Sequence, residues 1–440
     1  MSDSATWRNL SWQDLTFEVP SSWRQLPGQD LTVVHPLRED LDYTPTFTAR
    51  YVPSRGRSLP QLASLAAAVL TSTAPDCLWL DTAPFRLSSG TEVRNGRRQV
   101  FLHASPAGEL VSYQWLIEDG ERLLEMSAHC TVAQSRHLQP LMLHLGDSVR
   151  RSGDGPAAGG PVTPTPFDAR LSGFPDREPR LDASASKAHG MPLETLDKVR
   201  GFQAWSHDGG WFDDASVRRI EAGGVLDPET FAGLGLSGTG SDRPAELQTL
   251  DSPHRHTAVL HTPRGSSSVD LRLSRDGFAG WAAPGLVAML DPDPAVEAHR
   301  LAADRQFISG AWDALPKAVL SWAGVTPAWL GWPPVTVDWS AIEDHAGPGS
   351  WASGTAGTAA AAALPEPLRD GRWWLLRLAG TDATPQPWLM TERHGCFAIT
   401  GEPGDDQATL VQVSALTVFT SLVEYWDEAT RGVTGGSGTS

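Results

Sequence analysis

Histidine is the residue type whose spacing most invites a chemical interpretation in this chain. The stretch HRHTAVLH contains His254, His256 and His261, and imidazole nitrogens are common ligands of transition metals. On a regular strand His254 and His256 would lie on one face and His261 on the other, and no carboxylate or cysteine set nearby completes a site. We therefore expect exposed strand histidines here, and no metal site.

A second candidate is the glycine motif GLGLSG, in which Gly233, Gly235 and Gly238 have the GxGxxG spacing. A dinucleotide-binding fingerprint needs a strand directly before these glycines and a helix directly after them, so that backbone amides face the pyrophosphate. The flanking residues DPE and GTGSD indicate loops on both sides instead. No cofactor is expected.

The sequence contains no local motif for a catalytic nucleophile and its base. His129 and Cys130 are adjacent in MSAHC, so on a strand they point to opposite faces and cannot act as a base and its nucleophile. We assign no catalytic residue. A hydrolase whose site is assembled from distant residues, such as His129, His261 and His394, stays open because a triad is defined by geometry and not by sequence position.

Tryptophan is the most unusual part of the composition. The chain has 18 tryptophans, and six of them fall between residues 312 and 351. Such a cluster can form core, a protein-binding face or a ligand platform. The candidates for contact with a protein partner are Trp329, Trp332 and Trp339, with Trp115 on the sheet of the N-terminal part.

Length and charge limit the class of protein. A chain of 440 residues is too long for one core, so two or three domains are expected. It carries 35 basic and 52 acidic residues, a net charge of −17, and such an acidic surface repels phosphate backbones. We expect no nucleic-acid partner.

The sequence also indicates where the protein works. It has no run of eighteen apolar residues, and its start, MSDSATWRNL, lacks the basic and apolar regions of a secretory signal. A cytoplasmic protein without a membrane span is therefore expected. Cys77, Cys130 and Cys396 form no CxxC pair, which favours reduced, buried thiols over a zinc site or a disulfide.

Residues 10–150 read as one α+β unit. Alternating apolar and polar residues predict strands at LTFEVP, LTVVHP, TFTARYV, FRLSSGTEV, RQVFLHAS, ELVSYQWLIE and RLLEMSAHCT. Apolar spacings of three and four residues predict one helix from Leu59 to Leu70 and a closing helix from Leu138 to Val149. The order of strands, helix, antiparallel meander and helix favours a sheet with helices on one face.

Residues 151–189 are rich in glycine and proline and predict a flexible linker. Residues 190–430 read as a larger α+β domain, and residues 431–440 as a flexible tail. Within this domain we expect strands at TAVLHT, SVDLRLS, GFAGWAA, VTVDW, WWLLRLAG, PWLMTERHG and CFAITGEP. The segment 295–324 is expected to be mainly helical, and 407–426 to be the terminal helix, with a strand as the alternative at its start.

The N-terminal unit resembles the PsbP-like family in its LpqN and DcrB branches. The residues that carry the resemblance are FEVPSSW (Phe17–Trp23), TFTARYV, LASLAAAVL and QWLIEDGERLLEMSAHCTV. The resemblance implies an antiparallel sheet sandwiched by helices and a binding or accessory role; one branch acts as chaperones for type VI secretion effectors. The signal and lipid-attachment cysteine of the lipoprotein members are missing here, which implies an intracellular member.

The second unit resembles the EspG chaperones of type VII secretion. The shared features are the strand pair TAVLHTPRGSSSVDLRLS, the helical middle, the late strands and the closing helix from Ala408. The resemblance implies a cytosolic chaperone for secreted helical partners, and it transfers no contact residue.

Three functions follow as hypotheses. The first is a non-enzymatic cytosolic chaperone or adaptor of a bacterial secretion system, which covers an apolar helix of a client protein. The second is the hydrolase with a site assembled from distant residues. The third is an immunity or structural component that binds one cognate partner.

Overall fold

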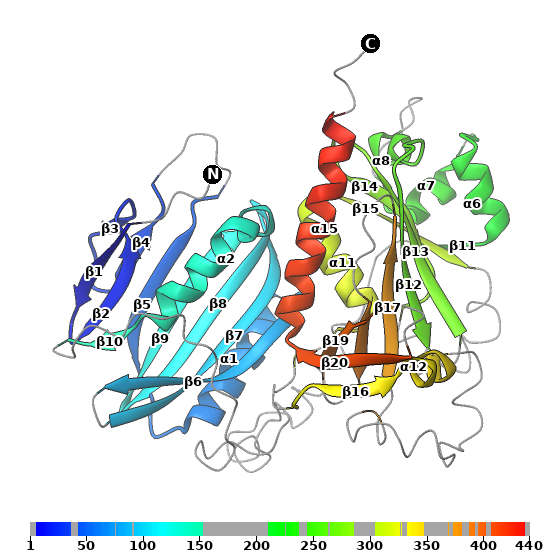
Figure 1. Cartoon of the computed structure of the whole chain (residues 1–440). Coiled ribbons are helices and arrows are strands. Elements are labelled where there is room, and N and C mark those ends of the chain that lie inside the picture. Colours follow the sequence, from blue (N-terminus) through cyan, green and yellow to red (C-terminus); the bar gives the residue numbers. More distant parts are fainter. Residues whose placement is uncertain are drawn as a thin grey trace. The chain divides into compact units, whose positions relative to one another are not determined.

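The computed structural model divides the chain into two compact units (Figure 1). The first comprises Met1–Arg200 with Pro327–Gly331, and the second comprises Gly201–Thr326 with Trp332–Ser440. The structure describes residues 6–36, 43–74, 76–89, 92–152, 210–224, 226–236, 244–262, 265–285, 304–325, 327, 332–346, 368, 373–380, 387–391, 395–401 and 406–435. Both units combine antiparallel sheets with helices, so the expected α+β class is confirmed.

The first unit is built on a seven-stranded antiparallel sheet. Its strand order is β3-β4-β5-β9-β8-β7-β6, and consecutive strands from β6 to β9 pair as the predicted meander. The bounds are β3 (Arg24–Leu26), β4 (Leu31–Val34), β5 (Thr46–Pro53), β6 (Leu78–Ser89), β7 (Glu92–Ser105), β8 (Gly108–Asp119) and β9 (Arg122–Thr131).

A small second sheet joins the two ends of this unit. It has the order β1-β2-β10, with β1 (Trp7–Trp12), β2 (Leu15–Pro20) and β10 (Arg150–Arg151). The opening strand β2 buries Leu15, Phe17 and Val19 completely, as its alternation predicts. Because β1 begins at Trp7, the folded unit starts before the predicted boundary at residue 10.

Two helices cover opposite faces of the seven-stranded sheet. Helix α1 (Leu59–Thr73) packs through Leu62 on Leu116 of β8. Helix α2 (Val132–Asp147) instead lies on Trp115, the neighbouring residue, because Gly146 directly faces that indole. Consecutive strand residues point to opposite faces, so the expectation of helices on one face is wrong and the sandwich implied by the resemblance is right. Element order alone does not encode the side on which a helix packs.

The second unit contains a ten-stranded antiparallel sheet. Its order is β11-β15-β14-β13-β12-β17-β18-β19-β20-β16. The bounds are β11 (Trp211–Phe212), β12 (Arg255–Thr262), β13 (Gly265–Leu273), β14 (Phe278–Ala282), β15 (Arg305–Gly310), β16 (Val335–Asp338), β17 (Trp373–Ala379), β18 (Trp388–Thr391), β19 (Gly395–Thr400) and β20 (Gln407–Val413).

Helices cover both faces of this sheet. One face carries α11 (Leu315–Trp322) and α15 (Ala415–Gly435), which pack on each other. The other face carries α6 (Asp214–Glu221), α7 (Pro228–Gly233) and α8 (Ala245–Thr249) at one end of the sheet and α12 (Trp339–Ala346) at the other end. The short turn η1 (Trp312–Ala314) precedes α11.

Three predicted boundaries in the second half of the chain differ from the structure. Residues 305–310 form the strand β15 inside the segment predicted to be helical. The terminal helix begins at Ala415, after the strand β20, so the alternative of a strand at its start is correct. Helix α15 continues to Gly435, into the predicted tail. The predicted linker from residue 153 onward lies outside the described residues.

Candidate functional site

Trp115 is not available to a partner in the folded unit. Its side chain is 0 % exposed, its ring packs against Gly146, and its Nε1 donates to Asp147 Oδ1 at 2.9 Å. The prediction that Trp115 contacts a client is therefore wrong. The tryptophan instead connects β8 to the end of α2, which is the ordinary role of a buried indole with a satisfied N–H.

The predicted contact tryptophans of the second unit differ in how far they are buried. Trp339 is 3 % exposed and belongs to a buried cluster with Ile342 and Leu368, so its assignment to a contact surface is also wrong. Trp332 is half-buried, packs against that cluster, and donates its backbone N–H to the side chain of Gln412. Trp329 lies outside the described residues. Of the predicted contact tryptophans that the structure describes, Trp332 alone keeps an accessible surface.

His256 is buried, although the sequence predicts an exposed histidine. It lies on the opposite face of β12 from His261, as predicted, but it is 2 % exposed where an exposed residue is expected. Its Nδ1 is 2.8 Å from the hydroxyl of Tyr425 in α15, and Trp426 packs on the ring. Burial, with a smaller contribution from His254, lowers the pKa of His256 to about 4. A neutral imidazole thus connects α15 to the sheet.

The histidines of the alternative hydrolase have separate local partners. Ser112 Oγ lies 2.7 Å from Nδ1 of His129 and 3.0 Å from Nε2 of His103. Burial, and next to it His103, lowers the pKa of His129 to about 4. Ser112 is only 1 % exposed, so a substrate cannot reach its hydroxyl without a rearrangement. His261, in the second unit, pairs with Ser266 at 2.9 Å.

The other motifs of the sequence are placed as follows. His394 lies outside the described residues. Cys130 is buried on the face of β9 opposite to His129, as strand alternation predicts. The segment before Gly233 is the helix α7, capped by the Asp227 side chain, where the sequence predicts a loop. Among the residues that the structure describes, no three histidine, cysteine or acidic side chains gather as metal ligands, and no helix is long and apolar enough to cross a membrane.

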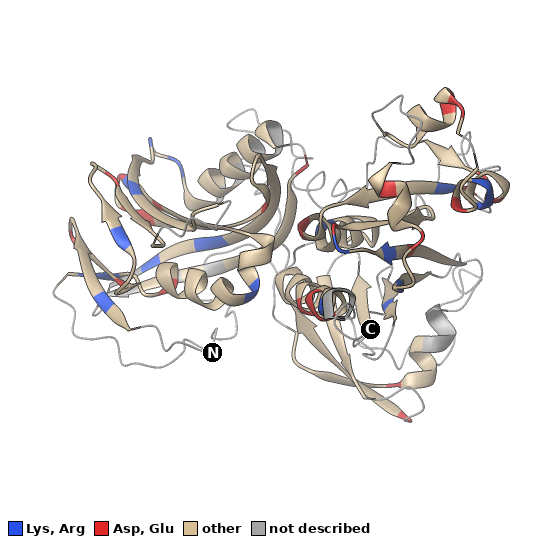
Figure 2. Ribbon diagram, turned by 90° about the horizontal axis from the view of Figure 1, so that it is seen from above, with Lys and Arg blue, Asp and Glu red and all other residues tan. Residues whose placement is uncertain are grey.

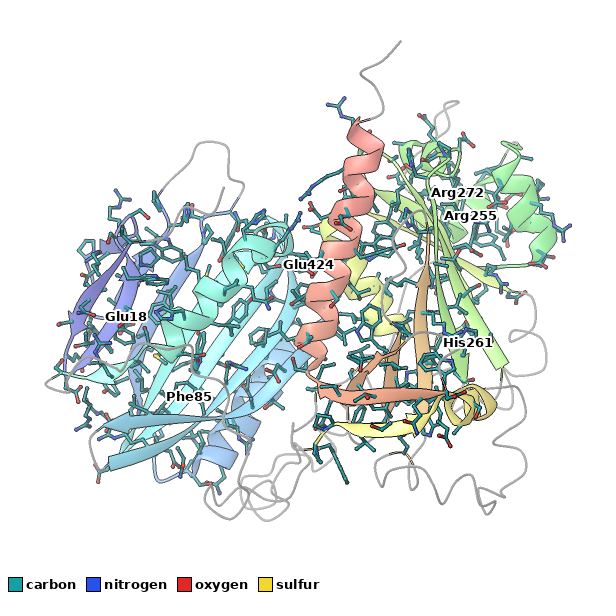
Figure 3. The ribbon with its side chains drawn as sticks, in the orientation of Figure 1. Glu18, Phe85, Arg255, His261, Arg272 and Glu424 are labelled. Carbon is teal, nitrogen blue, oxygen red and sulfur yellow. The ribbon has the colours of Figure 1, made fainter. Side chains whose placement is uncertain are left out.

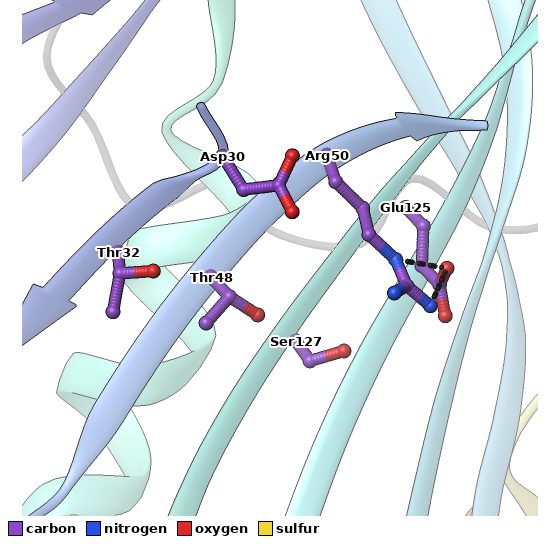
Figure 4. Close-up of a pocket in the computed structure, with 6 residues that line it drawn as sticks. All are labelled: Asp30, Thr32, Thr48, Arg50, Glu125 and Ser127. Atoms are coloured by element: carbon purple, nitrogen blue, oxygen red, sulfur yellow. Dashed lines mark hydrogen bonds and ion pairs between the residues drawn. The ribbon is translucent and has the colours of Figure 1, made fainter. Parts of the chain in front are cut away.

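A polar depression of about 280 Å³ lies on the seven-stranded sheet (Figure 4). The strand register explains it: Thr48 of β5 stands opposite Ser127 of β9, and Arg50 stands opposite Glu125. Residues directly opposite each other share a face, and these fall on the face that α1 covers only in part. The lining residues are Asp30, Thr32, Thr48, Arg50, Glu125 and Ser127.

The depression offers hydroxyls and one ion pair. Arg50 Nη2 lies 2.8 Å from Glu125 Oε2, and Glu125 also accepts from Gln114 at 3.0 Å. The two charges compensate each other, and 56 % of the Arg50 side chain is exposed to water. A site of this kind can hydrogen-bond a polar ligand, but its one arginine is already paired with Glu125, and the carboxylate of Asp30 makes the lining negative overall.

The second unit has an area of its sheet that no described helix covers, which we call the open strip. It lies on the face of β12, β13 and β17 opposite to α11 and α15, and all of its members are exposed or half-buried. Figure 3 labels three of them along the two central strands. The open strip consists of Arg255, Thr257, Val259 and His261 on β12, Ser268, Asp270 and Arg272 on β13, and Arg377 on β17.

Buried clusters flank the open strip on both sides. On β14, Trp281 pairs with Asp270 and belongs to the cluster beneath α6, α7 and α8. On β17, Leu375 pairs with His261 and belongs to the cluster beneath α12. The helical layer on this face therefore covers the two ends of the sheet and, among the described elements, leaves the three strands between them bare.

The charges of the open strip are predominantly positive. Arg255 stands directly opposite Arg272 across β12 and β13, although like charges in that position destabilise a sheet. Asp270 is 3.4 Å from Arg255 Nη2 and accepts from the Thr257 hydroxyl at 2.9 Å. In the part of the chain that the structure describes, neither Arg272 nor Arg377 has an ion-pair partner. Figure 2 shows basic residues within strands of both units.

Comparison with known proteins gives few matches. The chain matches no protein-family model and no curated protein. Several solved structures are similar. One is a protein of unknown function from Pseudomonas aeruginosa, with 12% identity and a TM-score of 0.24, and the match covers 32% of this chain and 94% of that chain. Two others are the cyanobacterial PsbP protein of Synechocystis (11% identity, TM-score 0.26, 34% of this chain and 95% of that chain) and LpqN of Mycobacterium tuberculosis, a protein involved in cell envelope biogenesis (12% identity, TM-score 0.24, 34% of this chain and 86% of that chain). The last two are of the PsbP and LpqN types that the first unit resembles. At these TM-scores the likeness carries no argument about function.

Proposed function

We propose that the protein is a non-enzymatic chaperone or adaptor, and that the open strip of its second unit holds a helix of a client protein. The observation that supports this proposal is the gap in the helical layer. An antiparallel sheet can leave one face to water, but this face carries helices at both of its ends and, among the described residues, none over the middle strands β12, β13 and β17. A client helix would complete the layer.

The dimensions of the open strip suit one helix. Neighbouring strands are about 4.8 Å apart, so β13, β12 and β17 together span about 10 Å, close to the diameter of a helix. From Arg255 to His261 the strip extends six residues along β12, about 20 Å in a strand, which corresponds to about 13 helical residues. Recognition of a helix in a groove is a common mode of peptide binding.

The resemblance of the second unit to EspG chaperones motivates the finer proposals. On that basis the client would be a secreted helical protein of a bacterial secretion system, and the chaperone would work in the cytoplasm. The first unit would serve as an accessory domain, as its resemblance to PsbP-like proteins implies. None of these three finer proposals depends on the geometry of the open strip.

Co-purification with a blocked strip tests the proposal. The tagged full-length chain is isolated from its native host, and the mass of the complex is measured by light scattering. Val259→Trp fills the centre of the open strip without changing its charge, and Val69→Trp on α1 is the matched control because Val69 is 52 % exposed in the first unit. We expect a stoichiometric client with the unaltered chain and the control, and its loss with Val259→Trp. Bare protein from all three preparations, together with turnover of a small molecule, would contradict the proposal.

A further inference from the structure

The arrangement of charge in the open strip is unusual for this chain. The protein carries a net charge of −17, yet Arg255, Arg272 and Arg377 share one face of three adjacent strands with the single carboxylate of Asp270. The Arg255–Arg272 pair places two positive charges directly opposite each other, which costs stability in the isolated protein. Asp270 compensates the pair only in part, since its ion pair with Arg255 is long, at 3.4 Å, and Arg255 is largely exposed. A local rule broken in this way is expected at a binding site.

We infer that the helix held in the open strip is acidic, with carboxylates on the side that faces the sheet. This inference rests on the proposed function and specifies the partner. Carboxylates beside Arg255 and Arg272 would remove the repulsion between the two guanidinium groups, since each arginine can make bidentate hydrogen bonds to a carboxylate. Arg377, which pairs with Val259 near the middle of β12, would receive a further carboxylate.

The remaining residues of the open strip are consistent with an amphipathic helix. Thr257, Val259 and Ser268 are half-buried and carry no charge, and they lie between the charged positions. Burial, with Arg377 as a second cause, lowers the pKa of His261. The partner's carboxylates are therefore expected opposite the arginines, and apolar residues between them.

Site-specific cross-linking separates this inference from the proposed function. The photoreactive amino acid benzoylphenylalanine replaces Ala379, an exposed residue opposite Thr257 at the rim of the open strip, where it leaves the centre of the strip free. The full-length chain is irradiated in native lysate, and the cross-linked segment is identified by mass spectrometry. The same experiment is repeated with Arg272→Glu and with Arg377→Glu. Arg275→Glu is the matched control, because Arg275 is exposed in the turn after β13, outside the open strip.

The inference predicts a cross-linked segment with an excess of aspartate and glutamate. Its yield should fall at least tenfold in Arg272→Glu and in Arg377→Glu, stay within twofold in Arg275→Glu, and fall as salt is added, because salt screens exposed charges. No cross-linked protein at all would overturn the proposed function. A cross-linked segment without acidic excess, a segment insensitive to both reversals, a second copy of this chain, or a nucleic acid would overturn the inference and leave docking at the strip intact.

Discussion

Arg255 of β12 stands directly opposite Arg272 of β13 on the open face of the second sheet. Repulsion between the two guanidinium groups lowers the stability of the free protein, whereas the same two charges would strengthen the binding of an acidic partner. Replacing one arginine should therefore raise the free energy of unfolding and weaken binding.

Arg272→Glu is therefore expected to stabilise the isolated protein while it abolishes client binding. Replacing a like-charged cross-strand pair with an opposite-charged one should raise the free energy of unfolding by about 0.5 kcal/mol. Denaturant titration of the purified chain measures this change, with Arg275→Glu as the control that should stay close to the unaltered protein. A loss of stability greater than 1 kcal/mol would show that Arg272 has a structural role instead.

Gly146→Ala is expected to destabilise the first unit, against the usual trend. In an open helix interior alanine is more favourable than glycine by about 1 kcal/mol. Here a Cβ at position 146 would overlap the indole of Trp115, and forced overpacking costs about 1–3 kcal/mol. Denaturant titration of Gly146→Ala should show a lower free energy of unfolding than that of the unaltered protein. A higher free energy of unfolding would mean that α2 does not pack on Trp115 as described.

Asp119→Asn should be among the most damaging polar substitutions in the first unit. The buried carboxylate of Asp119 forms ion pairs with Arg94, Arg122 and Arg151, which come from β7, β9 and β10. Removing one partner of a buried charge network leaves charges uncompensated and costs about 3 kcal/mol. Asp14→Asn is the control, because Asp14 is more exposed and contacts Arg151 at 3.5 Å; its cost should stay below about 1 kcal/mol.

The second unit should lose stability as the pH falls from about 6.5 to 4. The pKa of folded His256 is about 4 because the ring is buried, whereas an unfolded histidine has a pKa near 6.5. Between these values the unfolded chain binds a proton that the folded chain does not, so acid favours unfolding, by roughly 2 kcal/mol at pH 4.5, and stability is level above about pH 7.

Two measurements check the assignment to His256. NMR titration should show its ring neutral down to about pH 4, and His256→Gln should remove one proton from the slope of stability against pH. A ring that titrates near 6.5 in the folded protein would contradict the buried contact with Tyr425.

Much of the fold could be predicted because strand alternation is a local property. The alternation in LTFEVP and in RHTAVLHT correctly separates buried from outward-facing positions. The strand β15 escaped prediction because RQFISG lies between segments of helical spacing and does not alternate: Gln306, Phe307 and Ile308 are all buried. The side on which α1 and α2 pack was not predictable, since it depends on which face of β8 each helix meets.

The candidate site was harder to predict than the fold. Tryptophan was the obvious signal, but Trp115 and Trp339 are core residues, because a large apolar ring gains most from burial. The arginines of the open strip lie in or beside the predicted strands TAVLHT, SVDLRLS and WWLLRLAG, and no local motif distinguishes them. Their significance comes from the pairing of β12 with β13 and β17, a long-range property that a single sequence does not show.

Protection of a cysteine in the open strip tests the central claim most directly. Cys130 and Cys396 are buried, and burial raises the pKa of both thiols, so a chain with Cys77→Ser has little background reactivity toward a thiol reagent. Val259→Cys in that background is labelled with and without the co-purified client. We expect the client to slow the labelling at least tenfold; an unchanged rate in a complex shown to be intact would contradict docking at the open strip.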